Sequence, residues 1–128
     1  MNKTYFKQYY AEHKETIKAR SKQYYETHRE EQRAKHKAKL AQIRDTVLRH
    51  YGARCVCCGE TEPQFLTIDH INNNGAAHRR SLGHGRNTGS SFYRWIIKNN
   101  FPNDLQVLCC NCNVAKGLYG ICPHQERK

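Results

Sequence analysis

The first 51 residues contain neither glycine nor proline, and the first of either is Gly52. Because strong helix breakers are absent and Lys, Glu, Gln, Ala and Arg abound, this stretch is predicted to be helical, either continuous or broken into two helices. The chain also lacks any long apolar run of the kind that spans a membrane. The sequence therefore argues against a membrane protein and predicts a soluble, intracellular one.

Acidic side chains are scarce. The chain carries 11 Asp and Glu against 22 Lys and Arg, for a formal net charge of +11. Residues 1–50 hold 13 basic against 6 acidic residues (+7), and residues 51–128 hold 9 against 5 (+4). Such a chain is expected to bind a polyanion, more weakly as salt rises. Ribosomal proteins and membrane-surface peptides are also basic, so charge alone does not name the partner.

The cysteine pattern argues against a secreted disulfide scaffold. The seven cysteines are an odd number, four of them fall in two CxxC pairs, and no secretion signal is present. These features favour reduced thiols that bind a metal in a cytosol.

An internal repeat occupies the glycine-free segment: residues 7–21 match residues 22–36 with a period of 15 residues, about four helical turns. Its apolar content is thin apart from paired tyrosines, so it can hardly fold against itself. It is predicted to be a DNA-binding arm whose basic face lies along the phosphate backbone; the alternative is a solvated helix that self-associates through its tyrosines. The charge favours the first. The basic candidates are Lys7, Arg20, Lys22, Arg33 and Lys35.

The end of this segment has a different pattern. Leu40, Ile43, Val47, Leu48 and Tyr51 recur at helical spacing and should dock on the following domain. The sequence thus predicts a basic helical extension over 1–38 and a second domain over 39–128.

Within the second domain, residues 65–69 alternate and predict a strand, and residues 72–90 predict a long polar loop. Residues 91–100 predict a helix, residues 105–108 a second strand, and residues 112–116 the start of the last helix. The predicted fold class is α+β.

Four cysteines are the predicted ligands of a structural zinc ion: Cys55, Cys58, Cys109 and Cys112. Two CxxC knuckles suit one tetrahedral ion in a domain too small for a large core. The fifty residues between the knuckles exceed the roughly 15–20 of a plain zinc ribbon, so they must hold further structure. Cys57 and Cys110, next to the knuckles, are expected to be packed or exposed thiols. Cys122 and His124 are a weaker candidate for a further metal site.

Between the knuckles lies the dipeptide Asp69-His70, a carboxylate that can hold a hard cation beside an imidazole that can activate water. Together with the cysteines and several polar positions, it makes residues 51–124 resemble an HNH endonuclease of the phage and mobile-element type. The matching residues are Cys55, Cys58, Asp69, His70, Asn73, Asn74, Gly75, Leu108, Cys109, Cys112, Asn113 and Lys116. The resemblance implies a small ββα-metal core stapled by zinc.

By this resemblance His70 would be the general base, and Asp69 and Asn113 would hold a catalytic Mg²⁺ or Mn²⁺. The family often has His where this chain has Asn113, so the chain is an H-N-N variant, and Asn113 is alternatively a helix cap. The place of the family's middle Asn is taken by Asp104, with Asn103 before it; Asn87 is a weaker candidate, and the assignment stays open.

A basic cluster following the catalytic strand is expected to contact DNA phosphates, with His78 nearby. Its members are Arg79, Arg80, Arg86 and Lys116.

The expected function is a metal-dependent endonuclease that hydrolyses phosphodiester bonds of double-stranded DNA, nicking one strand or cutting both. It would act in the cytoplasm, that of a bacterial host if a phage encodes it. A homodimer or a larger complex is considered, and the oligomeric state stays open. The alternative is a non-catalytic zinc-binding module that binds nucleic acid.

Overall fold

The computed structural model describes residues 2–83 and 89–127. The chain divides into two compact units, residues 1–39 and residues 40–128. The described residues are mostly helical and contain one two-stranded antiparallel sheet, which is compatible with the predicted α+β class.

The first unit consists of α1 (Lys3–Thr27) and the beginning of α2 (Arg29–His50), so the glycine-free segment is broken into two helices at His28. The Asn2 side chain caps the start of α1 by accepting from the Thr4 amide at 3.2 Å. At the other end, the Thr27 hydroxyl donates to the Tyr24 carbonyl at 3.0 Å and the His28 amide to the same carbonyl at 3.0 Å. Both bonds go to the Tyr24 carbonyl, which is thereby satisfied in the last turn of α1.

The sequence repeat is also a structural repeat. The Tyr9 ring stacks on His13 with centroids 4.2 Å apart, and the Tyr24 ring stacks on His28, fifteen residues later, at 4.0 Å. In each pair the histidine Nδ1 lies within hydrogen-bond distance of the tyrosine carbonyl. No residue of α1 is buried. The helix therefore presents exposed aromatic and basic side chains without a core of its own.

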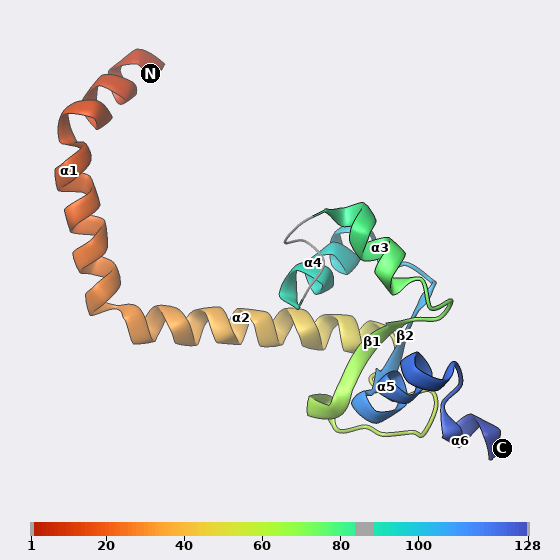
Figure 1. Cartoon of the computed structure of the whole chain (residues 1–128). Helices are drawn as coiled ribbons and strands as arrows, with labels where there is room; N and C mark the ends of the chain where they lie inside the picture. Colours follow the sequence, from red (N-terminus) through yellow and green to blue (C-terminus); the bar gives the residue numbers. More distant parts are fainter. Residues whose placement is uncertain (1, 84–88, 128) are drawn as a thin grey trace. The chain divides into compact units, whose positions relative to one another are not determined.

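The centre of the second unit is the sheet of β1 (Leu66–His70) and β2 (Leu105–Cys109), paired antiparallel with His70 opposite Leu105. Helix α5 (Cys110–Tyr119) follows β2 directly and contacts both strands, as Figure 1 shows. Both predicted strands are confirmed: β1 is shifted by one residue from the predicted 65–69, because Phe65 belongs to η1, and β2 extends the predicted 105–108 by one residue at its C-terminal end.

The remaining elements are η1 (Pro63–Phe65), α3 (Gly75–Leu82), α4 (Ser90–Lys98) and α6 (Pro123–Glu126). The predicted helix over 91–100 is confirmed by α4. The prediction of an uninterrupted loop over 72–90 is wrong, because α3 occupies part of it. The helix starting within 112–116 begins slightly earlier, at α5, and α6 follows it.

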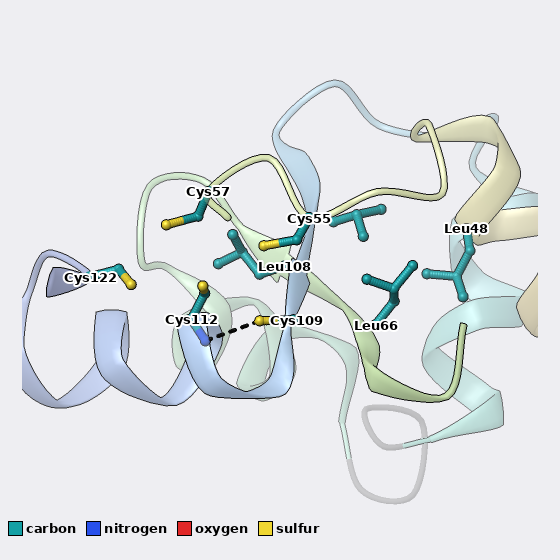
Figure 2. Packing of buried hydrophobic residues seen from close by; sticks show 9 residues of the cluster. Leu48, Cys55, Cys57, Leu66, Leu108, Cys109, Cys112 and Cys122 are labelled. Atoms are coloured by element: carbon teal, nitrogen blue, oxygen red, sulfur yellow. Dashed lines mark hydrogen bonds between the residues drawn. The ribbon is translucent and has the colours of Figure 1, made fainter. Parts of the chain in front are cut away.

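The core of the second unit has two clusters. One contains Val47, Ile96 and Leu105. The other, in Figure 2, contains nine buried residues, of which five are cysteines. The C-terminal part of α2 contributes to both through Val47 and Leu48, as its helical spacing predicts. Arg44 fastens this part of the helix by donating to the carbonyls of Pro63 and Leu66, both at 2.6 Å.

Candidate metal centre and candidate active site

The four predicted zinc ligands come together. The sulfur atoms of Cys55, Cys58, Cys109 and Cys112 all lie within 4.8 Å of one another. The sulfurs of Cys58, from the first knuckle, and Cys109, from the second, are 3.7 Å apart. Ligands of one tetrahedral zinc ion, with Zn–S bonds of about 2.3 Å, are about 3.8 Å apart. The group therefore has the composition and spacing of a structural zinc site.

Local backbone geometry positions both knuckles. In the first, the Gly59 amide donates to the Cys55 carbonyl at 3.0 Å, and the turn gives Gly59 a φ of +84°, which favours glycine. The Val56 amide donates to the Val107 carbonyl at 3.0 Å and joins this knuckle to β2. The second knuckle is the junction of β2 and α5, where the Cys109 sulfur caps the helix by accepting from the Cys112 amide at 3.5 Å.

Two thiols of this group, Cys55 and Cys112, have pKa values shifted in opposite directions. Burial raises the pKa of the Cys55 thiol, but backbone N–H groups of Cys58, Cys109 and Cys57 outweigh it, and the pKa falls to about 6. Burial and neighbouring thiols raise the pKa of Cys112. Backbone donors thus favour a thiolate at the first knuckle, the form that a zinc ion requires.

A second group of ligand atoms adjoins the first. The sulfurs of Cys57, Cys112 and Cys122 and a ring nitrogen of His124 also lie within 4.8 Å of one another. The sequence points to Cys122 and His124 as a weak metal candidate, but it leaves Cys57 as a packed or exposed thiol. The missed signal is the Cys-x-Cys-Cys spacing, since a CxxC knuckle uses only two of the three thiols.

His70 ends β1 and faces α3 and α4. Its Nε2 lies 2.8 Å from Nδ1 of His78, and its ring stacks on Phe92 with centroids 5.5 Å apart. His78 is in turn packed edge-on against Trp95 at 4.3 Å. The pKa of His70 is lowered by burial and by the charge of His78, against smaller opposing effects of Asp104 and Asp69. At neutral pH the His70 imidazole is therefore uncharged. The sequence places His78 only near the phosphate cluster, and its pairing with His70 was missed.

Asp69 lies on the opposite face of β1, because successive strand residues point to opposite sides. Its Oδ2 accepts from Lys116 Nζ at 2.6 Å and from Gln106 Nε2 at 2.8 Å. Lys116 also donates to the carbonyls of His70 at 2.7 Å and Ile71 at 3.2 Å. Three oxygens at the end of β1 thus surround one cationic nitrogen. The Lys116 side chain is only 14% exposed and points toward the strand.

Asn113 lies one turn before Lys116 on α5. Its Nδ2 donates to the Thr67 hydroxyl at 2.9 Å, and Thr67 shares the face of β1 that Asp69 occupies. The structure therefore brings Asp69, Asn113 and Lys116 to one side of the strand, and His70 and His78 to the other.

The other described residues predicted to contact DNA are all exposed. Arg79 and Arg80 are exposed on α3, and Lys7, Arg20, Lys22, Arg33 and Lys35 are exposed on α1 and α2.

Three residues are candidates for the place of the family's middle Asn, and of these Asp104 lies beside His70 in space. Its carbonyl accepts from the Ile71 amide at 3.0 Å, and its carboxylate acts on the His70 pKa. Asn103 is exposed. The predicted phosphate contact Arg86 and the candidate Asn87 lie outside the described residues.

No protein-family model, curated protein or solved structure matches this chain. Across residues 2–83 and 89–127, none of the helices has both the length and the apolarity needed to cross a membrane.

Proposed function

We propose that this chain is a zinc-stapled, metal-dependent DNA endonuclease of the HNH type. The observation that carries the proposal is the end of β1, where a partly buried carboxylate, Asp69, and a neutral imidazole, His70, follow each other directly. The second zinc knuckle begins the helix that contributes Asn113 and Lys116 to the same strand end. Zinc would hold the fold, and these side chains would carry the chemistry.

His70 is the proposed general base. Burial and His78 lower its pKa, so the imidazole is in the proton-accepting form at neutral pH. The hydrogen bond between the His70 and His78 rings fixes the orientation of the base. After proton transfer, the resulting imidazolium has the Asp69 and Asp104 charges near it, both of which favour the protonated form.

Asp69 and Asn113 are the proposed protein ligands of Mg²⁺ or Mn²⁺. The donor set fits a hard cation, because the atoms around Lys116 Nζ are a carboxylate oxygen and two carbonyl oxygens, and the amide oxygen of Asn113 would join them. A bound divalent ion supplies charge stabilisation to the phosphate and to the leaving 3′ oxygen. Lys116, released from Asp69, would then reach a phosphate.

DNA contact is proposed for the exposed basic residues of α3 and for the repeat of α1 and α2. Arg79 and Arg80 follow His78 directly on α3, so phosphates held there would lie near the proposed base. The basic residues of α1 are exposed along a helix without buried side chains, which leaves the whole surface available for backbone contacts.

A zinc-binding nucleic-acid module without catalysis is the rival. Lys116 favours it, because an ammonium group already neutralises Asp69, the carboxylate that a catalytic cation would need. The two functions differ in one measurable property, which is cleavage.

The test is cleavage of supercoiled plasmid by the zinc-loaded chain with Mg²⁺, with Mn²⁺ or with neither. Omitting the divalent ion, rather than adding a chelator, leaves the zinc in place. His70→Ala is the test variant, and His36→Ala, an exposed histidine of the other unit, is its matched control. We expect the intact chain and His36→Ala to give open circles or linear DNA only with the divalent ion. His70→Ala should bind DNA and leave the plasmid intact.

Intact plasmid in every lane, with DNA binding still visible by gel shift, would favour the zinc-binding module. Equal cleavage by His70→Ala would contradict the role of the base.

A further inference from the structure

We infer that this chain binds a second zinc ion, held by Cys57, Cys122 and His124 and joined to the first through the thiolate of Cys112. The structure places Cys112 in both groups of ligand atoms. Figure 2 shows its sulfur lying between those of Cys55 and Cys109 on one side and those of Cys57 and Cys122 on the other. The inference does not depend on the proposed nuclease activity.

The number of ligands matches a pair of ions. Two tetrahedral zinc ions have eight coordination positions. The two groups together contain six cysteines and one histidine, and one cysteine is common to both. Seven donors with one bridge fill the eight positions. The seventh cysteine, Cys110, is exposed and belongs to neither group.

The distances match as well. With Zn–S of about 2.3 Å and Zn–N of about 2.0 Å, tetrahedral geometry puts a sulfur and a nitrogen on the same ion about 3.5 Å apart. His124 Nδ1 lies 3.3 Å from the Cys112 sulfur and 3.5 Å from the Cys122 sulfur. The imidazole therefore stands where a zinc ligand stands relative to both thiols.

Charge balance favours the pair. One zinc with four thiolates carries a net charge of −2. The second ion adds +2 and two further thiolates, so the pair also carries −2. Cys57, Cys112 and Cys122 are 5%, 0% and 6% exposed. Because burying an uncompensated thiolate is costly, a second cation accounts for this concentration of buried sulfur better than one ion alone.

The local backbone positions Cys122 and His124, two of the proposed ligands of the second ion. Cys122 and His124 flank Pro123, whose ring restricts the backbone, and the Gln125 amide donates to the Cys122 carbonyl at 2.8 Å to close the turn. His124 is exposed and would give the ion a path of entry. The second ion would thus fasten α6 to the first knuckle.

The experiment measures zinc per chain after zinc-saturated, full-length protein is freed of loosely bound metal on a desalting column. The test variant is the double substitution Cys122→Ser with His124→Ala, which leaves only two ligands for the second ion. The matched control is Cys110→Ser, which removes the one thiol outside both groups. We expect two zinc ions per chain in the intact protein and in the control, and one in the double variant.

Bridging is tested on the same proteins loaded with ¹¹³Cd. Two metals that share a thiolate give two coupled resonances, and the double variant should give a single uncoupled resonance. That remaining resonance also shows that the four-cysteine site of the variant is still folded.

One zinc ion per intact chain would overturn the inference. Two cadmium resonances without coupling would overturn the bridge. Loss of one zinc ion from Cys110→Ser as well would show that the second metal binds nonspecifically to thiols, which also refutes it.

Discussion

The contact between Lys116 and Asp69 should be a main support of the second unit, and Lys116→Met tests this. The substitution keeps most of the side-chain length but removes the ammonium group. It would leave the Asp69 carboxylate, 11% exposed, with Gln106 as its one remaining hydrogen-bond partner among the described residues. The Ile71 carbonyl would lose the Lys116 donor too, and the His70 carbonyl would keep the Asn73 amide at 3.1 Å.

The expected cost follows from burial. Removing one partner of a buried ion pair costs about 3–5 kcal/mol, because the other charge is left uncompensated. Both side chains here retain slight exposure, 14% for Lys116 and 11% for Asp69, so we expect about 3 kcal/mol. With a urea dependence of about 1 kcal/mol per molar for a small unit, the unfolding midpoint should fall by about 3 M.

The assay is urea unfolding, followed by circular dichroism in a zinc-saturating buffer. The control is Lys35→Met, which removes an ion pair with Glu31 at 2.8 Å whose side chains are 66% and 56% exposed. It should leave the midpoint unchanged, because water screens the exposed pair. Adding Asp69→Asn to Lys116→Met removes the orphaned charge and should recover most of the loss.

Two results would refute this reasoning. One is a midpoint for Lys116→Met that equals that of the intact chain. The other is a double variant no more stable than Lys116→Met alone, because the penalty would then not come from the carboxylate.

Three further predictions concern the candidate active site and the metal. Gly75→Ala would place a methyl carbon 3.0 Å from His70 Nδ1, and displacement of the imidazole should lower plasmid cleavage roughly tenfold to a hundredfold. The control Gly117→Ala has open space around its methyl group and should cleave at the rate of the intact chain. Equal cleavage rates for the two variants would contradict this prediction. His78→Ala removes one cause that lowers the His70 pKa, so the acid limb of cleavage between about pH 5 and 8 should move to higher pH; a limb that moves to lower pH would refute the pairing. Removal of zinc should abolish the cooperative unfolding transition of residues 40–128, because five of the nine residues of one core cluster are cysteines. Added zinc should restore the transition. An unchanged transition after zinc removal would exclude a structural metal.

Short-range signals made the sheet and the cysteine group predictable. Alternation over residues 65–69 marks a strand with one buried face, and two CxxC pairs place four sulfurs on two turns. The apolar spacing at the end of α2 likewise identifies Val47 and Leu48 as core, and both are buried. In each case the pattern lies within a few residues of the chain.

Helix α3 was not predictable in the same way. It begins with glycine, carries adjacent arginines, and has no buried residue. Its contacts are tertiary: His78 packs on Trp95 and pairs with His70, and these partners come from α4 and β1. A pattern within residues 72–90 alone cannot show these contacts, and propensity there favours a loop.

The sequence indicates Cys122 and His124 as a weak metal candidate, but it does not link Cys57 to them, because Cys57 lies far from both in sequence. Cys57 and His124 approach each other only after α5 has folded back on β2, so no local spacing links them. The faces of Asp69 and His70, in contrast, follow from strand alternation alone once β1 is placed.

Strand β1 lies in the chain between the two cysteine knuckles, so the proposed activity would depend on the proposed zinc site. Cys58 and Cys109, 51 positions apart, close a loop that contains all of β1, and a cross-link of this length contributes about 4 kcal/mol by restricting the unfolded chain. Asn113 directly follows Cys112, a candidate zinc ligand, so we expect a chain without zinc to lack a fixed helix from which Asn113 can reach β1. Under the proposed function, newly made protein would therefore have to bind zinc before it could cleave DNA, and cleavage would depend on the supply of zinc as well as on the catalytic cation.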